Sequence, residues 1–148
     1  MSVRRLRRSA LLILFETDVL LALISPGDKH HTEAVRLLDK FLGGVRLSPY
    51  SLTELNLLLK SGEIVVREVK AFYSSLGDLF MYRDVGLLPA KPIYHGEAYE
   101  LRRRYERLTY FDSLHAAVGI VEGLELVSYD EEYAKVTELK YGHPTKYV

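Results

Sequence analysis

The 148-residue chain is long enough to fold around one ordinary hydrophobic core and too short for two. Apolar residues make up 48% and charged residues 27%, the balance of a globular protein and not of a disordered one. Twenty basic residues cancel twenty acidic ones and cysteine is absent, which excludes a broadly basic nucleic-acid coat, disulfides and thiolate chemistry. A polyanion must therefore bind a local patch.

The chain begins with a basic segment over residues 1–9, which is followed by apolar residues from Ala10 to Ile24. Three polar residues at positions 16–18 interrupt this apolar stretch. The pieces on either side are far shorter than the roughly 20 residues of a membrane-spanning helix. We therefore predict a basic tail over residues 1–9, a single domain over residues 10–148, no membrane span and a cytoplasmic location.

The hydrophobic pattern predicts strands that alternate with helices. Leu11–Phe15 is a continuous apolar run typical of a strand covered on both faces, and Asp18 is suited to cap the helix after it. Further strands are expected at Val45–Ser48, Val85–Leu88 and Leu124–Ser128, with an edge strand from about Leu139. Further helices are expected at about Thr32–Leu42, Ser51–Lys60, Val65–Leu76, Ala98–Leu108 and Phe111–Val121. This order predicts an α/β fold, a three-layer α/β/α sandwich with a central, mostly parallel sheet of four or five strands.

Acidic residues fall at the ends of the predicted strands, where parallel sheets place their sites. Glu16 and Asp18 follow the first strand, and Glu54 lies in the first turn of the helix after the second. Asp130 follows the fourth strand, and Asp112 begins the helix that leads into it. Carboxylates gathered in this way suit Mg²⁺ or Mn²⁺, and such an ion can activate water and stabilise a departing oxyanion. The pattern therefore predicts a metal site.

Most of these carboxylates also have a purely structural interpretation. Glu54 and Asp112 each stand at the fourth position of a capping-box pattern. Asp18 is suited to an N-cap, and Asp130 to the cap of a turn. Glu16 is harder to explain in this way, because burying an unpaired carboxylate among apolar residues is costly. The prediction of a metal site therefore depends on the shared placement of these residues.

Four motifs occur in order over roughly residues 11–135. They are Glu16-Thr17-Asp18 before an apolar helix, Ser51-x-x-Glu54, Asp112-x-x-His115-Ala-Ala, and Gly123 followed by a strand and Ser128-x-Asp130. In this order they resemble the PIN-domain nucleases, which include the VapC-type toxins. The family usually carries Asp where Glu16 stands, and Asn or Ser where Asp18 stands.

The resemblance implies a metal-dependent endoribonuclease that uses one or two Mg²⁺ or Mn²⁺ ions. The implied ligands are the five acidic residues Glu16, Asp18, Glu54, Asp112 and Asp130, of which the last four are also the implied catalytic residues. Thr17 and Ser128 would steady the ligands or a phosphate. For a toxin-type member, the family further implies a homodimer and a small antitoxin partner.

Other residues are candidates for contacts around such a site. Arg102, Arg103 and Arg104, with the arginines of the tail, are candidates for binding RNA phosphates, although a solvated helix face is the alternative. His115 lies one turn after Asp112 and is expected to pack or to form a hydrogen bond beside the site. Two other functions stay open: a catalytically degenerate PIN domain that binds RNA or a protein partner without cleavage, and a flavodoxin-like domain that binds a small ligand. The acidic start of the first helix would repel a phosphate, which argues against the flavodoxin-like domain.

Overall fold

A computed structural model describes residues 11–148 of the protein, and the basic tail predicted at residues 1–9 lies outside the described residues. The strands are β1 (Ile13–Phe15), β2 (Val45–Leu47), β3 (Gly86–Leu87), β4 (Glu125–Val127) and β5 (Tyr141–Gly142). The helices are α2 (Thr17–Ile24), α3 (His31–Lys40), α4 (Tyr50–Ser61), α5 (Val69–Tyr82), α6 (Pro92–Arg104) and α7 (Tyr110–Glu122), with 3-10 turns η1 (Glu131–Lys135) and η2 (Pro144–Lys146). Within residues 11–148, no helix is long and apolar enough to cross a membrane.

The five strands form one sheet in the order β3-β2-β1-β4-β5, and every neighbouring pair is parallel. β1 is central, with Ile13 opposite Val45 on one side and Glu125 on the other. The edge strand expected near the C-terminus is β5. The predicted α/β fold with a parallel central sheet is confirmed.

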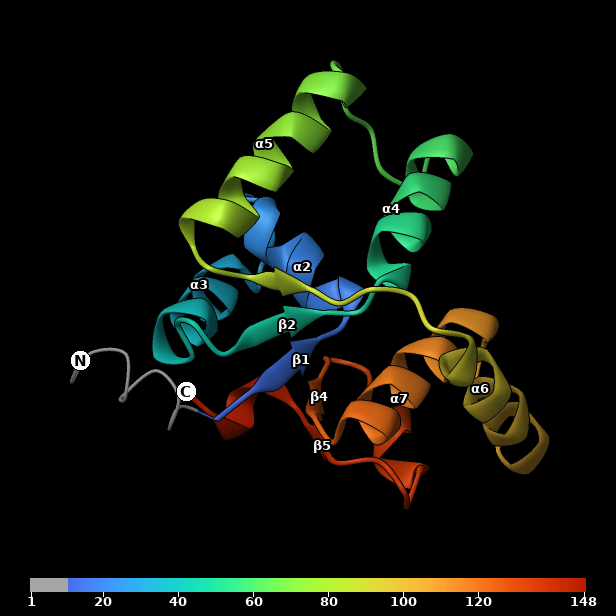
Figure 1. Ribbon diagram of the computed structural model, residues 1–148. Coiled ribbons are helices and arrows are strands. Elements are labelled where there is room, and N and C mark those ends of the chain that lie inside the picture. Colours follow the sequence, from blue (N-terminus) through green and yellow to red (C-terminus); the bar gives the residue numbers. More distant parts are fainter. Residues whose placement is uncertain (1–10) are drawn as a thin grey trace.

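The sheet separates two hydrophobic cores, because successive side chains of a strand point to opposite faces. Ile13 and Phe15 of β1 pack into a core with α2, α3 and α5, whereas Leu14 packs into a core with α6 and α7. These helices form the two outer layers of the sandwich (Figure 1). Gly123 ends α7 with φ of 68°, a left-handed conformation that favours glycine, and the chain turns there into β4.

Two helices differ from their predicted bounds. α5 begins at Val69, and Val65, which was expected to belong to it, is 86% exposed on the preceding loop. α6 begins at Pro92, whose fixed φ suits a first helical turn, and it ends at Arg104. Leu108 is buried but not helical, and its spacing from the apolar residues of α6 had wrongly indicated that the helix continues to it.

Candidate metal centre

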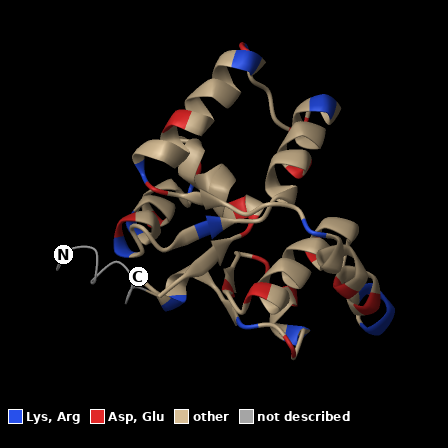
Figure 2. Ribbon diagram, in the orientation of Figure 1, with Lys and Arg blue, Asp and Glu red and all other residues tan. Residues whose placement is uncertain are grey.

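The candidate site lies at the carboxyl-end rim of the sheet, between β1 and β4. The chain leaves β1 toward β2 on one side of the sheet and later returns to β4 on the other side, which opens a crevice at that rim. Glu16 directly follows β1, and its backbone N–H donates to Val127 O of β4 at 3.0 Å. Figure 2 shows acidic segments in the centre of the molecule beside the start of α2.

Glu16 and Asp18 form the first wall of the site. Glu16, and not Asp18 as predicted, is the N-cap of α2, and its Oε1 accepts a hydrogen bond from Asp18 N at 3.4 Å. Asp18 instead lies in the first turn, where its Oδ2 accepts from Ser128 Oγ at 2.8 Å and from Tyr129 N at 2.9 Å. Ser128 Oγ also lies 3.2 Å from Glu16 Oε2. One serine, directly after β4, therefore contacts both carboxylates.

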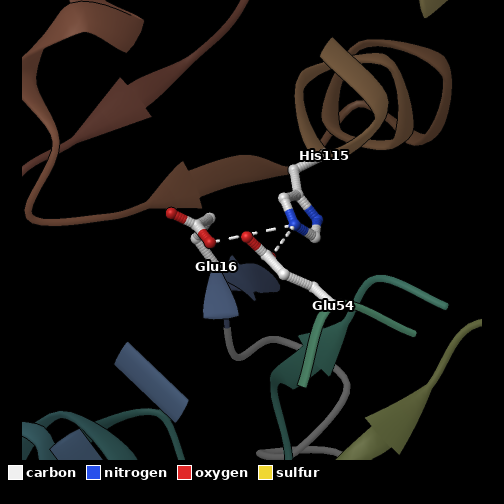
Figure 3. Close-up of side chains that lie close together, drawn as sticks. All are labelled: Glu16, Glu54 and His115. Atoms are coloured by element: carbon white, nitrogen blue, oxygen red, sulfur yellow. Dashed lines mark hydrogen bonds and ion pairs between the residues drawn. The ribbon is translucent and has the colours of Figure 1, made fainter. Parts of the chain in front are cut away.

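Glu54 and His115 form the opposite wall. His115 Nε2 lies 2.9 Å from Glu54 Oε1 and 3.8 Å from Glu16 Oε1 (Figure 3). The capping box predicted for Glu54 is not formed, because α4 begins after Pro49 without a side-chain cap. One ligand atom each from Glu16, Glu54 and His115 lie within 4.8 Å of one another, a spacing that fits a shared cation.

A buried hydroxyl fixes the imidazole of His115. Thr17 Oγ1 donates to Ser51 Oγ at 3.0 Å and lies 3.3 Å from His115 Nε2. Thr17, Ser51 and His115 are all buried, so these contacts hold the ring in one orientation. Without an ion, Glu54 accepts a hydrogen bond from His115 Nε2; for Nε2 to bind a cation, the imidazole would have to carry its proton on Nδ1 instead.

Asp112 and Asp130 border the centre and also have structural roles. Asp112 completes a capping box with Thr109, as the sequence indicated, and its Oδ1 accepts from Tyr133 OH at 3.1 Å. Asp130 caps η1 by accepting from Glu132 N at 3.0 Å, and it is exposed. Their charges act on the other carboxylates, since Asp112 raises the pKa of Glu16 and Asp130 raises the pKa of Asp18.

Burial and mutual repulsion disfavour the ionised carboxylates. Burial, reinforced by the charges of Asp18, Glu54 and Asp112, raises the pKa of Glu16 well above its usual range. Burial raises the pKa of Asp18 to about 6, although Ser128 and Tyr129 hydrogen bonds oppose the shift. Burial also opposes ionisation of Glu54, but hydrogen bonds from His115 and Thr17 outweigh it and lower the pKa of that group.

These shifts predict that the metal-free protein loses stability as the pH rises. Between its ordinary value of 3.8 and the folded pKa of about 6, Asp18 keeps its proton in the folded state and loses it in the unfolded state. The folded state then binds more protons, so the free energy of unfolding falls with rising pH, by on the order of 3 kcal/mol from Asp18 alone. Glu16 acts in the same direction.

Urea unfolding in EDTA between about pH 4 and pH 7 measures this dependence. Glu54 has the opposite effect on stability. Because its pKa is lowered from the ordinary value of 4.5, that effect develops below pH 4.5 and so outside most of this pH range. Saturating Mn²⁺ at pH 7 is expected to restore the lost stability. A metal-free protein that gains stability over this range contradicts the expected repulsion.

The residues of the site fit a hard divalent cation. Carboxylate oxygens are the ligands that Mg²⁺ and Mn²⁺ prefer, and an imidazole nitrogen can join them on Mn²⁺. Asp18 Oδ1 is buried and has no hydrogen-bond partner among the described residues. An unpartnered buried carboxylate oxygen beside a repelling neighbour is costly, and a cation would offset that cost.

Two contributors to the site were not predicted as such. Ser51, three residues before Glu54, anchors Thr17 and could have been found by its place on the same helix face. Tyr133 donates to Asp112, and burial, together with the charge of Glu16, raises its pKa, so its hydroxyl keeps its proton. No pattern in the sequence pairs Tyr133 with Asp112.

Known families and structures resemble this chain. The PIN domain family model matches residues 13–139, whereas no curated protein matches the sequence. VapBC2 from Rickettsia felis, bound to a DNA fragment from its promoter, matches with TM-score 0.71 and 19% identity over 90% of this chain and 98% of that one. A toxin-antitoxin complex from Klebsiella pneumoniae gives TM-score 0.64 and 19% identity over 89% and 97%. The sarcin-ricin loop cleaving toxin VapC20 from Mycobacterium tuberculosis gives 0.66 and 23% over 84% and 94%.

Proposed function

Because the chain belongs to the PIN domain family, we propose that it is a Mg²⁺- or Mn²⁺-dependent endoribonuclease that hydrolyses RNA phosphodiester bonds. The observation that supports this proposal is the convergence of Glu16, Glu54 and His115 within 4.8 Å at the rim of the sheet. An acidic centre with no cation would repel a phosphodiester, so a bound cation is needed for the RNA backbone to approach it.

In the proposed reaction, Glu16, Asp18 and Glu54 would hold one or two ions, with Asp112 and Asp130 completing the set directly or through water. A bound ion would supply activation of water, orientation of the phosphodiester and stabilisation of the leaving oxyanion. Ser128 steadies Glu16 and Asp18, whereas Thr17 steadies His115 and through it Glu54.

The likeness to toxins supports a further proposal about partners. A structural neighbour from Klebsiella pneumoniae is described as a toxin-antitoxin complex, and VapC20 is described as a toxin. We propose that this chain acts in the cytoplasm as a homodimer that a small antitoxin inhibits. Size-exclusion chromatography with light scattering tests the dimer, and co-expression with the product of an adjacent gene tests the antitoxin.

Cleavage of a labelled RNA by the purified protein tests the proposed activity. We expect cleavage in Mn²⁺ or Mg²⁺ and none in excess EDTA, because the carboxylates cannot activate water without the ion. Restoring Mn²⁺ after chelation is expected to restore cleavage. RNA cleavage that persists in EDTA would overturn the proposed mechanism.

A non-cleaving PIN domain that binds RNA or a protein is the second candidate, and Glu16 in the place of the usual Asp favours it. Calorimetric titration with Mn²⁺ separates the two functions. The nuclease requires binding at millimolar concentration or tighter, whereas a protein that lacks such binding and folds normally supports the non-enzyme. The earlier alternative, a flavodoxin-like ligand-binding domain, is not proposed for a member of the PIN family.

A further inference from the structure

One side of α6 carries a stripe of side chains that reaches the starts of α4 and α7. His95, Tyr99 and Arg102 occupy positions i, i+4 and i+7 of this helix and so lie along one side of it. His95 Nε2 lies 2.6 Å from Tyr50 OH, at the start of α4. Arg102 Nη1 donates to Ser113 Oγ of α7 at 2.8 Å.

Arg102 differs from the arginines that follow it. Arg103 pairs with Glu100 at 3.9 Å, and Arg104 pairs with Glu97 at 3.8 Å and Glu138 at 2.6 Å. Over residues 11–148, no carboxylate forms an ion pair with Arg102. Its guanidinium lies 5.1 Å from the ring centroid of Tyr110, and Ser113 is its only hydrogen-bond partner within the described part of the chain. Most of its five donors are therefore available to a phosphate.

Exposed aromatic rings accompany this guanidinium. Tyr110 is 55% exposed and Tyr99 is 56% exposed, although covering a tyrosine ring is favourable. Tyr50 of α4 is only 8% exposed, so its contact with His95 positions that ring from within the protein. Arg102 lies against the ring of Tyr110, so the exposed rings of α6 and α7 border one surface.

This surface adjoins the metal centre through two helices. Tyr50 precedes Glu54 by one turn on the same side of α4. The ring of Tyr110 lies 5.7 Å from the ring of Phe111, which in turn lies 6.4 Å from the imidazole of His115 at the metal centre. α6 and α7 pack side by side (Figure 1), so the stripe on α6 continues the surface away from the carboxylates. A chain that lies on it can present a phosphodiester bond to the centre.

We propose that His95, Tyr99, Arg102 and Tyr110, here called the aromatic strip, bind a single-stranded segment of the RNA substrate, with Arg102 on a phosphate and Tyr110 stacked on a base. The inference rests on the proposed nuclease function and names the form of RNA that the site accepts. Bases in a duplex are already stacked on each other, so the strip selects unpaired nucleotides. Arg103 and Arg104, predicted with Arg102 to bind RNA, already form ion pairs with glutamates, so we expect them to contribute less to RNA binding.

Binding of a labelled oligoribonucleotide in Mn²⁺ tests the strip in the Asp112→Asn background, which prevents cleavage. We expect Arg102→Gln and Tyr110→Leu each to weaken binding about tenfold, and duplex RNA of the same sequence to bind less tightly than the single strand. Arg102→Gln is also expected to reduce the slope of log K against log salt by about 0.7, the change for one lost phosphate contact. Arg67→Gln and Tyr82→Leu, exposed residues outside the strip, are the matched controls for charge and ring.

Cleavage kinetics in the otherwise wild-type protein distinguish failure of the strip from failure of the nuclease. The strip predicts that Arg102→Gln raises KM with little change in kcat, and that Arg102→Lys recovers part of the loss. If the wild-type protein cleaves RNA and the strip variants match the controls in binding and KM, the strip is overturned and the nuclease stands. If the wild-type protein binds RNA but does not cleave, and the variants still weaken binding, the strip stands without the nuclease. Variants that lose a protein partner while RNA binding is unchanged also overturn the inference.

Discussion

Asp112→Asn is expected to abolish metal-dependent RNA cleavage and to leave the protein folded. The change removes one charge at the start of α7 and keeps the size of the side chain. Because Asp112 acts electrostatically on Glu16 and would complete the metal ligands, we expect cleavage to fall by about 100-fold or more. Cleavage rates of the variant and the wild type in the same Mn²⁺ concentration measure the effect.

The stability of this variant is expected to change little. Asn can accept only one of the hydrogen bonds that Asp112 accepts from Thr109 N and Tyr133 OH, and a lost cap costs about 1 kcal/mol. The removal of repulsion on Glu16 offsets part of this cost. We expect the melting temperature to stay within a few degrees. Glu106→Gln, an exposed acidic residue outside the site, is the control, and a fully active Asp112→Asn protein would remove Asp112 from the mechanism.

Glu16→Gln is expected to change metal-free stability and metal binding in opposite directions. Glu16 is 7% exposed and its charge is disfavoured by burial and by neighbouring carboxylates, so a neutral amide should raise the melting temperature in EDTA. The same change removes a ligand, so the stabilisation by Mn²⁺ and RNA cleavage are expected to disappear. Thermal unfolding of both proteins with EDTA and with Mn²⁺ measures the two effects.

Glu16→Asp tests whether this site is built around the longer side chain. Glu16 Oε2 accepts from Ser128 Oγ at 3.2 Å, and shortening the side chain by one methylene would withdraw the carboxylate from that contact. We therefore expect Asp at this position to bind Mn²⁺ more weakly than Glu and more tightly than Gln. Tighter binding than wild type would mean that Glu16 is a defect in the site and would support the non-cleaving alternative.

Much of the fold could be predicted because the signals were local. Apolar runs marked strands β1 to β4, and the alternation of strands with helices indicated the parallel arrangement. The bounds of α5 and α6 were wrong because exposed Val65 and buried Leu108 followed a helical spacing without being helical. Such spacing records which residues are apolar, whereas the surrounding packing decides which of them are helical.

The candidate site was predictable in composition and less so in geometry. Residues that follow parallel strands had to meet at one rim, so Glu16, Asp18 and Asp130 could be placed there from the sequence. The N-cap of α2 was assigned to Asp18 and is Glu16, because either carboxylate can accept a hydrogen bond at a helix start. His115 and Glu54 are 61 residues apart in the sequence, and their contact becomes apparent only when α4 packs beside α7.

Anomalous diffraction from a crystal soaked in Mn²⁺ tests most directly whether the rim carboxylates share a cation. We expect a manganese peak between Glu16 and Glu54, with carboxylate oxygens at about 2.0–2.6 Å from it. His115 is buried and held beside Thr17, so its ring is expected to keep its orientation whether or not Nε2 binds the ion. A soaked crystal with no manganese at this rim, or with manganese bound only by exposed glutamates elsewhere, would contradict the proposed metal centre.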